Sequence, residues 1–180
     1  MESIYLRTNK RGLEIQKIIS LNTQITRAES SQSFSVLLKG ALSNSPSVST
    51  GGVMIKTANN DQLVIQLELA SLDLNGADGS ADKFERFKNI SVRLPALPGP
   101  YQELEITLGM ETVNYVALSR RLDGSGMFRI DFIDSRHLPF QDDASSGKLV
   151  LTFFNAGTGQ AQRELVESLV DVIFKFDYTL

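Results

Sequence analysis

The stretch Ser91-Val-Arg-Leu-Pro-Ala-Leu-Pro-Gly-Pro-Tyr101 decides how this chain folds. Val92 and Leu94 alternate with polar residues, as in a half-buried strand. Three of the five prolines then follow within six positions, and proline has a fixed φ and no N–H for a strand ladder. We therefore expect a strand that stops at Pro95, a stiff extended crossing, and a new strand that opens at Tyr101.

Alternating apolar residues predict further strands on both sides of this corner. The segments 115–119 and 127–133 are expected to form a hairpin, because the stretch Leu122–Gly126 between them contains two glycines. The closing stretch 170–178 is expected to turn one row of side chains to the core, namely Val170, Val172, Phe174, Phe176 and Tyr178. The other predicted strands cover residues 13–21, 62–69, 86–94, 101–108 and 148–154.

Two segments have helical rather than alternating spacing. Residues 31–42 place four apolar side chains on one helical face, with Ser30 and Ser31 as candidate N-caps, and residues 160–169 show a similar face. The composition of the stretch 43–52 is typical of a flexible loop. Many short strands with turn signals between them predict a mainly β protein, a β-sandwich of short antiparallel strands with these two short helices.

Bulk properties limit the class of protein further. With 180 residues the chain fits one domain, with 1–12 as a linker or entering strand and 13–180 as the sandwich. A net charge of −3 argues against a nucleic-acid binder. The absence of cysteine excludes disulfides and thiolate metal sites. No stretch is apolar enough to span or insert into a membrane, and the first residues do not read as a secretory signal.

The sequence contains no recognisable catalytic constellation. His137 is the only histidine, so neither a triad nor a zinc site can be assembled around it. The acidic stretch 73–84 suggests calcium, but an EF-hand loop needs oxygen ligands at its fifth and twelfth positions, which hold Ala77 and Phe84. No phosphate-binding loop or nucleophile elbow is present. We expect no catalytic residue, no metal, no cofactor and no enzymatic activity.

The second half of the chain nevertheless resembles the extreme C-terminus of the A components of bacterial insecticidal Tc toxin complexes. Several uncommon phrases recur in order with similar gaps between about Ile90 and Leu180, and the resemblance thins upstream to Lys10–Ile15 and Ile19–Leu21. The matching phrases are Ile90–Gln102, Val116–Ser119, Asp123–Phe132, His137–Phe140, Leu149–Asn155 and Leu165–Ile173.

This resemblance implies a docking role without chemistry. In that family the A component is a pentamer whose C-terminal domains bind the β-propeller of the B component, part of a cocoon that encloses a toxic enzyme. Docking then allows the enzyme to enter the channel. The implied partners are therefore the B component and neighbouring A-component protomers, and the implied location is secreted or on the bacterial surface.

Loops on a rigid sandwich are the expected contact sites, because loops vary without disturbing a core. Three predicted loops are the first candidates, and the residues singled out in them are Asn75, Asp78, Asp123, Ser125, Arg136, His137 and Asp142. The alternative interpretation is a carbohydrate- or receptor-binding sandwich. That alternative needs an exposed aromatic platform, and the chain has no tryptophan and only four tyrosines.

Overall fold

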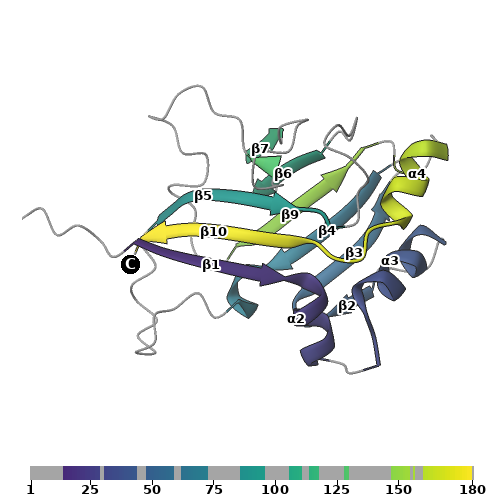
Figure 1. Cartoon of the computed structure of the whole chain (residues 1–180), viewed down its shortest axis with the longest axis horizontal. Helices are drawn as coiled ribbons and strands as arrows, with labels where there is room; N and C mark the ends of the chain where they lie inside the picture. Colours follow the sequence, from purple (N-terminus) through teal and green to yellow (C-terminus); the bar gives the residue numbers. More distant parts are fainter. Residues whose placement is uncertain are drawn as a thin grey trace, which may run out of the picture.

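The described residues fold into two antiparallel sheets stacked face to face, with the three α-helices gathered at one end (Figure 1). The fold was obtained as a computed structural model. It describes residues 14–28, 31–43, 48–58, 62–72, 86–95, 106–110, 114–117, 128–129, 147–154, 156 and 160–179. The predicted β-sandwich is confirmed.

The four-stranded sheet, sheet A, is organised around the last strand of the chain. β10 (Ile173–Thr179) pairs with β1 (Glu14–Ser20) on one side and with β5 (Arg86–Arg93) on the other. The short β8 (Phe128–Arg129) forms the far edge beside β5. The first and last described strands are therefore direct neighbours.

The six-stranded sheet, sheet B, has β4 and β9 at its centre. Its order is β2-β3-β4-β9-β6-β7, and every pair is antiparallel. The strands are β2 (Val48–Thr50), β3 (Val53–Ala58), β4 (Gln62–Glu68), β9 (Lys148–Phe153), β6 (Ile106–Met110) and β7 (Asn114–Ala117).

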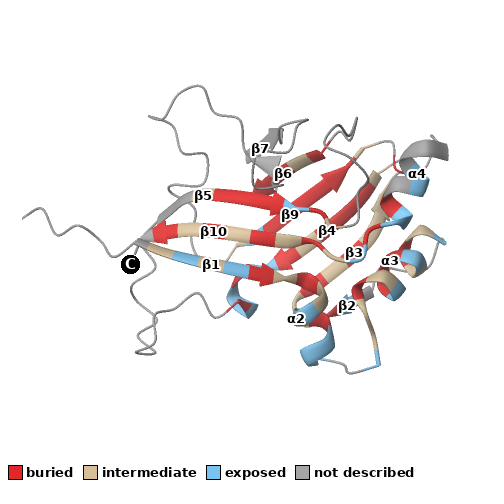
Figure 2. Cartoon of the chain, in the orientation of Figure 1, coloured by how far each residue is buried: buried red, intermediate tan, exposed pale blue. Residues whose placement is uncertain are grey.

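Alternation within the strands builds the core between the two sheets. Along β10, Phe174, Phe176 and Tyr178 are buried, whereas the residues between them are only partly covered (Figure 2). The facing rows of sheet B are equally apolar, and residues of both sheets belong to one buried cluster. The prediction that Val170 continues this row is wrong: it precedes the strand and is 52% exposed.

Three α-helices and one short 3-10 helix complete the described structure. Both predicted helices are present, as α3 (Phe34–Leu42) and α4 (Gln160–Glu167). The sequence analysis missed α2 (Leu21–Ala28), which starts directly after β1, and the 3-10 turn η1 (Leu69–Ser71). The N-cap position of α3 is Ser33 rather than Ser30 or Ser31. No helix in the described ranges is long and apolar enough to cross a membrane.

The proline corner separates the two sheets, as its composition predicts. β5 ends at Arg93 in sheet A, and the next described strand, β6, starts at Ile106 in sheet B. The predicted opening of that strand at Tyr101 lies outside the described residues. The predicted hairpin is wrong, because β7 pairs with β6 in sheet B whereas β8 pairs with β5 in sheet A. Two glycines between the strands did not make β7 and β8 partners, since each strand pairs elsewhere.

The second half of the stretch 43–52, from Val48 on, forms regular structure that its composition does not suggest. β2 lies within it and pairs with β3 across a turn at Gly51 and Gly52, whose φ angles are +61° and +76°. A Cβ at Gly51 would approach the Gln24 carbonyl oxygen of α2 to 2.7 Å. This tight turn therefore brings the edge of sheet B against α2, which only residues without a side chain permit.

Alanine substitutions at Gly52 in the turn and at Gly40 in α3 are expected to change stability in opposite directions. Gly52→Ala is expected to lower the free energy of unfolding by about 2 kcal/mol, because alanine is strained at positive φ and its Cβ would overlap Ser71 Oγ. Gly40→Ala in α3 meets nothing within 4 Å and should raise that free energy by about 0.5–1 kcal/mol. Urea unfolding monitored by circular dichroism measures both, and equal effects of the two variants would contradict the assignment.

Candidate functional surface

The described residues contain one convergence of polar side chains, where β1, α2 and the start of β10 meet. Asp171 lies at its centre. Its Oδ2 accepts a hydrogen bond from Ser20 Oγ at 2.6 Å, and its Oδ1 accepts from the backbone N–H groups of Asn22 at 2.9 Å and Val172 at 2.8 Å. We call these residues the Asp171 cluster.

The Asp171 cluster satisfies the first turn of α2. The first three N–H groups of a helix have no partner within the helix and need acceptors elsewhere. Here Leu21 donates to the Val172 carbonyl oxygen, Asn22 donates to Asp171, and Thr23 donates to Ser20 Oγ. A carboxylate at this position is also favoured by the helix dipole. The cluster therefore fixes the helix to a strand that lies about 150 residues later in the chain.

The same contacts extend to the next helix. Asn22 Oδ1 accepts a hydrogen bond of 3.0 Å from the N–H of Phe34, the first residue of α3. Phe34 is fully buried in the shared core. Because one side chain of α2 caps α3, the two helices and β10 are positioned as a unit.

This arrangement does not have the chemistry of a nucleophile. Activation of a serine needs a general base that can take its proton, normally a histidine held by a carboxylate. Ser20 Oγ donates to Asp171 and accepts from Thr23, with no histidine in the cluster. Across the described ranges, no three His, Asp or Glu side chains gather in a way that could hold a metal ion. We interpret the Asp171 cluster as structural.

The seven residues singled out from the sequence all lie outside the described residues: Asn75, Asp78, Asp123, Ser125, Arg136, His137 and Asp142. The structure therefore does not test their roles. It does fix the strand ends from which their segments start. We name the end of the sandwich with the Glu14–Thr179 pair the terminal end, and the end beside α2, α3 and α4 the helical end (Figure 1).

Two of the three segments each have one end at the terminal end, although the segment 130–146 starts from β8, which lies toward the helical end. The segment 73–85 follows η1, and the segment 130–146 precedes β9. The Leu69 N–H donates to the Gly147 carbonyl oxygen at 3.1 Å, and Lys148 Nζ lies 3.8 Å from Glu68 Oε1. Asn75, Asp78 and Asp142 therefore lie close in sequence to these neighbouring points, whereas Arg136 and His137 lie nearer in sequence to the end of β8.

The third segment is rooted at the opposite end. It starts after Ala117 of β7, which lies one ladder position away from the Ile106–Phe153 pair. It ends at β8, which pairs with Val92 near the end of β5. Both points lie toward the helical end (Figure 1). Asp123 and Ser125 are thus tethered away from Asn75, Asp78 and Asp142, while Arg136 and His137 follow β8 on its other side.

Exposed apolar side chains add no patch to either end. Within the described part of the chain the large ones are Ile18, Val36 and Val170, at 65%, 58% and 52% exposure. They lie on three different elements: β1, α3 and the link between α4 and β10. Single exposed apolar residues are ordinary on protein surfaces.

Comparison with known proteins shows which proteins this chain is similar to. No protein-family model matches the chain. The toxin subunit YenA2 of Yersinia entomophaga is 25% identical over 212 aligned residues, covering 99% of this chain and 13% of the relative. Two solved structures cover 99% of the chain with a TM-score of 0.72: TcaA–TcaB of Yersinia pseudotuberculosis at 31% identity and TcdA4 of Morganella morganii at 30%. The chain is a homologue of Tc toxin A subunits.

The homology to Tc toxin A subunits confirms the resemblance and extends it. The sequence analysis found the main similarity from about Ile90 onwards and only short matches at Lys10–Ile15 and Ile19–Leu21, whereas the alignments with the Tc toxin chains reach across 99% of the sequence. The chain corresponds to about a tenth of those chains, 10% and 8% of the two solved ones. A Tc toxin A-component-related domain is therefore established, and the activity of the whole toxin subunit is a separate question.

The structural role of the Asp171 cluster in this Tc toxin domain can be tested with a matched pair of aspartates. Asp171→Ala is expected to lower the free energy of unfolding by about 2–4 kcal/mol, because it leaves partly buried N–H donors without an acceptor. Asp177→Ala removes a surface pair with Gln16 and Lys175 and should change it by at most about 1 kcal/mol. Chemical denaturation measures both, and a small effect of Asp171→Ala would contradict the structural role of the Asp171 cluster.

Proposed function

We propose that this chain is the docking domain through which a Tc toxin A component binds the β-propeller of the B component. Binding assembles the toxin and allows the enclosed toxic enzyme to enter the channel. The observation that carries the proposal is the match to two Tc toxin structures over 99% of the chain, at 30–31% identity and a TM-score of 0.72. In this role the domain acts outside the bacterium as part of the secreted or surface-bound complex.

The packing of the described residues suits a passive adaptor. The core is a single apolar cluster between two sheets, and the Asp171 cluster has its hydrogen-bonding groups engaged internally. A frame of this kind presents its connecting segments without changing shape itself. The proposal therefore assigns binding, and no catalysis, to the domain.

The terminal end is the proposed contact surface. The start of the segment 73–85 and the end of the segment 130–146 lie at neighbouring backbone positions there, joined by the Leu69–Gly147 hydrogen bond. One partner surface can engage both segments together. Asp123 and Ser125 are tethered at the other end, so in this proposal they do not share that contact.

Several copies strengthen the contact. In the proposed pentameric ring, each copy adds a weak interaction to a partner that is already held, and the effective local concentration reaches the millimolar range for short tethers. Overall binding can then exceed that of a single domain by a factor of about 100 or more. Weak binding by one isolated copy is compatible with the function.

The test displays five copies of the chain on a pentameric scaffold and measures their binding to immobilised cognate B component by interferometry. Asp78→Lys and Asp142→Lys are each expected to weaken binding by about tenfold, because reversed charge inside a contact is unfavourable. Asp123→Lys makes the same chemical change at the helical end and should alter binding by less than about twofold, as charges outside the contact do.

The outcomes separate the function from the location of the contact. No binding of the unmodified scaffold to the B component would contradict the docking function. Binding that is weakened by Asp123→Lys and unaffected by the other two variants would keep the function and move the contact to the helical end. Selective hits on a glycan array, together with no B-component binding, would favour the carbohydrate-binding alternative.

A further inference from the structure

The two sheets differ in how their edges are protected. An edge strand exposes unpaired N–H and C=O groups, on which a strand of another molecule can assemble. Three edge strands of the described sheets are very short: β2 has three residues, β7 four and β8 two. Short edges offer few hydrogen bonds to an incoming strand. The fourth edge, β1, has seven residues.

β1 has few of the usual features that block pairing. It contains no proline, and all its residues pair with β10 in unbroken register, whereas the ladder between β10 and β5 shifts at Asp177/Tyr178. Three of its seven residues are isoleucine, and Ile18 is 65% exposed. A long, regular and apolar edge of this kind is the type that self-associates.

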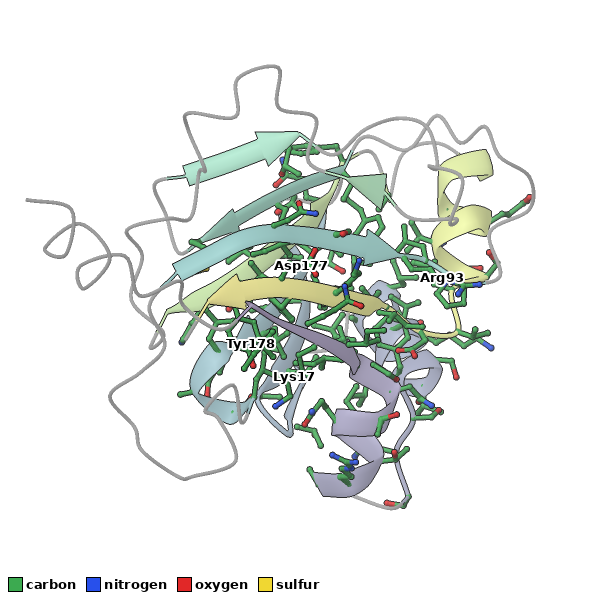
Figure 3. The ribbon with its side chains drawn as sticks, turned by 60° about the vertical axis from the view of Figure 1, so that its left-hand side comes forward. Lys17, Arg93, Asp177 and Tyr178 are labelled. Carbon is green, nitrogen blue, oxygen red and sulfur yellow. The ribbon has the colours of Figure 1, made fainter. Side chains whose placement is uncertain are left out.

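Lys17 is the exception in this strand. It lies in the inward row of β1, between Ile15 and Ile19, and pairs in register with the buried Phe176. Figure 3 shows Lys17 and Tyr178 on one side of the β1–β10 pair and Asp177 on the other. The side chain is partly buried, and no carboxylate in the described residues forms an ion pair with it.

We propose that Lys17 protects the open edge of β1 against pairing with a second copy of this chain. At the edge of the sheet its long side chain reaches past the apolar core to water. A strand added beside β1 would cover that route and leave the ammonium group buried without a partner, which is strongly unfavourable. In the symmetric register centred on Lys17, two ammonium groups would also lie directly opposite each other.

This protection of β1 acts against pairing between copies of the chain. It does not depend on which partner the end segments bind. It acts against strand addition, because Lys17 joins the ladder to β10 through its backbone groups and its ammonium group forms no ion pair within the described residues. Removal of the charge should therefore leave the fold intact. Valine at this position also suits an inward-facing strand residue.

The experiment compares the whole chain with Lys17→Val and Lys17→Arg by sedimentation over a range of concentrations. Lys17→Val is expected to raise the self-association constant at least tenfold, and Lys17→Arg, which keeps the charge, should leave it unchanged. Hydrogen exchange of the associated variant should show new protection of β1 backbone amides. Thermal melts followed by circular dichroism confirm that each variant is folded.

Two results would overturn the proposal. The first is a folded Lys17→Val variant with the same association constant as the unmodified chain. The second is increased association without protection of the β1 amides, which would place the new contact elsewhere. The double variant Lys17→Val/Ile18→Lys returns a charge to the same edge and is expected to reverse the association; association that persists in it would also count against the edge as the contact.

Discussion

The burial of the inner row of β10 against sheet B is the interaction on which the rest of the structure depends. Phe174 and Phe176 are fully buried and stack on each other with ring centroids 5.9 Å apart. Each large side chain removed from water contributes about 1.5–3 kcal/mol. Because β10 also pairs with both β1 and β5, this one strand positions most of sheet A over sheet B. The ends of the strands, from which the proposed contact segments start, are fixed as a consequence.

The Asp171 cluster extends that constraint from the sheets to the helices. The Asp171 carboxylate connects the start of β10 to the first turn of α2. The Asn22 side chain in turn accepts a hydrogen bond from the first residue of α3. Partly buried polar groups contribute to a unique structure when each has a partner. The helical end is therefore held to the same strand that organises the core. A domain whose strands and helices are held to one another in this way suits the proposed docking role.

Local patterns in the sequence predicted those features of the fold that depend on residues close together in the chain. Alternation located β4, β5, β9 and β10, and the prolines located the passage between the sheets. The sequence could not reveal which strands pair, because β7 and β8 choose partners in different sheets by long-range packing. It also missed α2, whose first turn is capped by Asp171 from the other end of the chain. The proposed contact residues carry no chemical signature, since docking loops need only shape and charge. The proposed function rests on the resemblance to Tc toxins instead.

The central claim is that this domain docks as a preformed frame through its terminal end. Hydrogen exchange of the chain, with and without the cognate B component, tests it most directly. The account predicts new protection confined to the segments 73–85 and 130–146, with the amides of β4, β9 and β10 exchanging at unchanged rates. Absence of protection in both segments, or faster exchange in those core strands on binding, would contradict it.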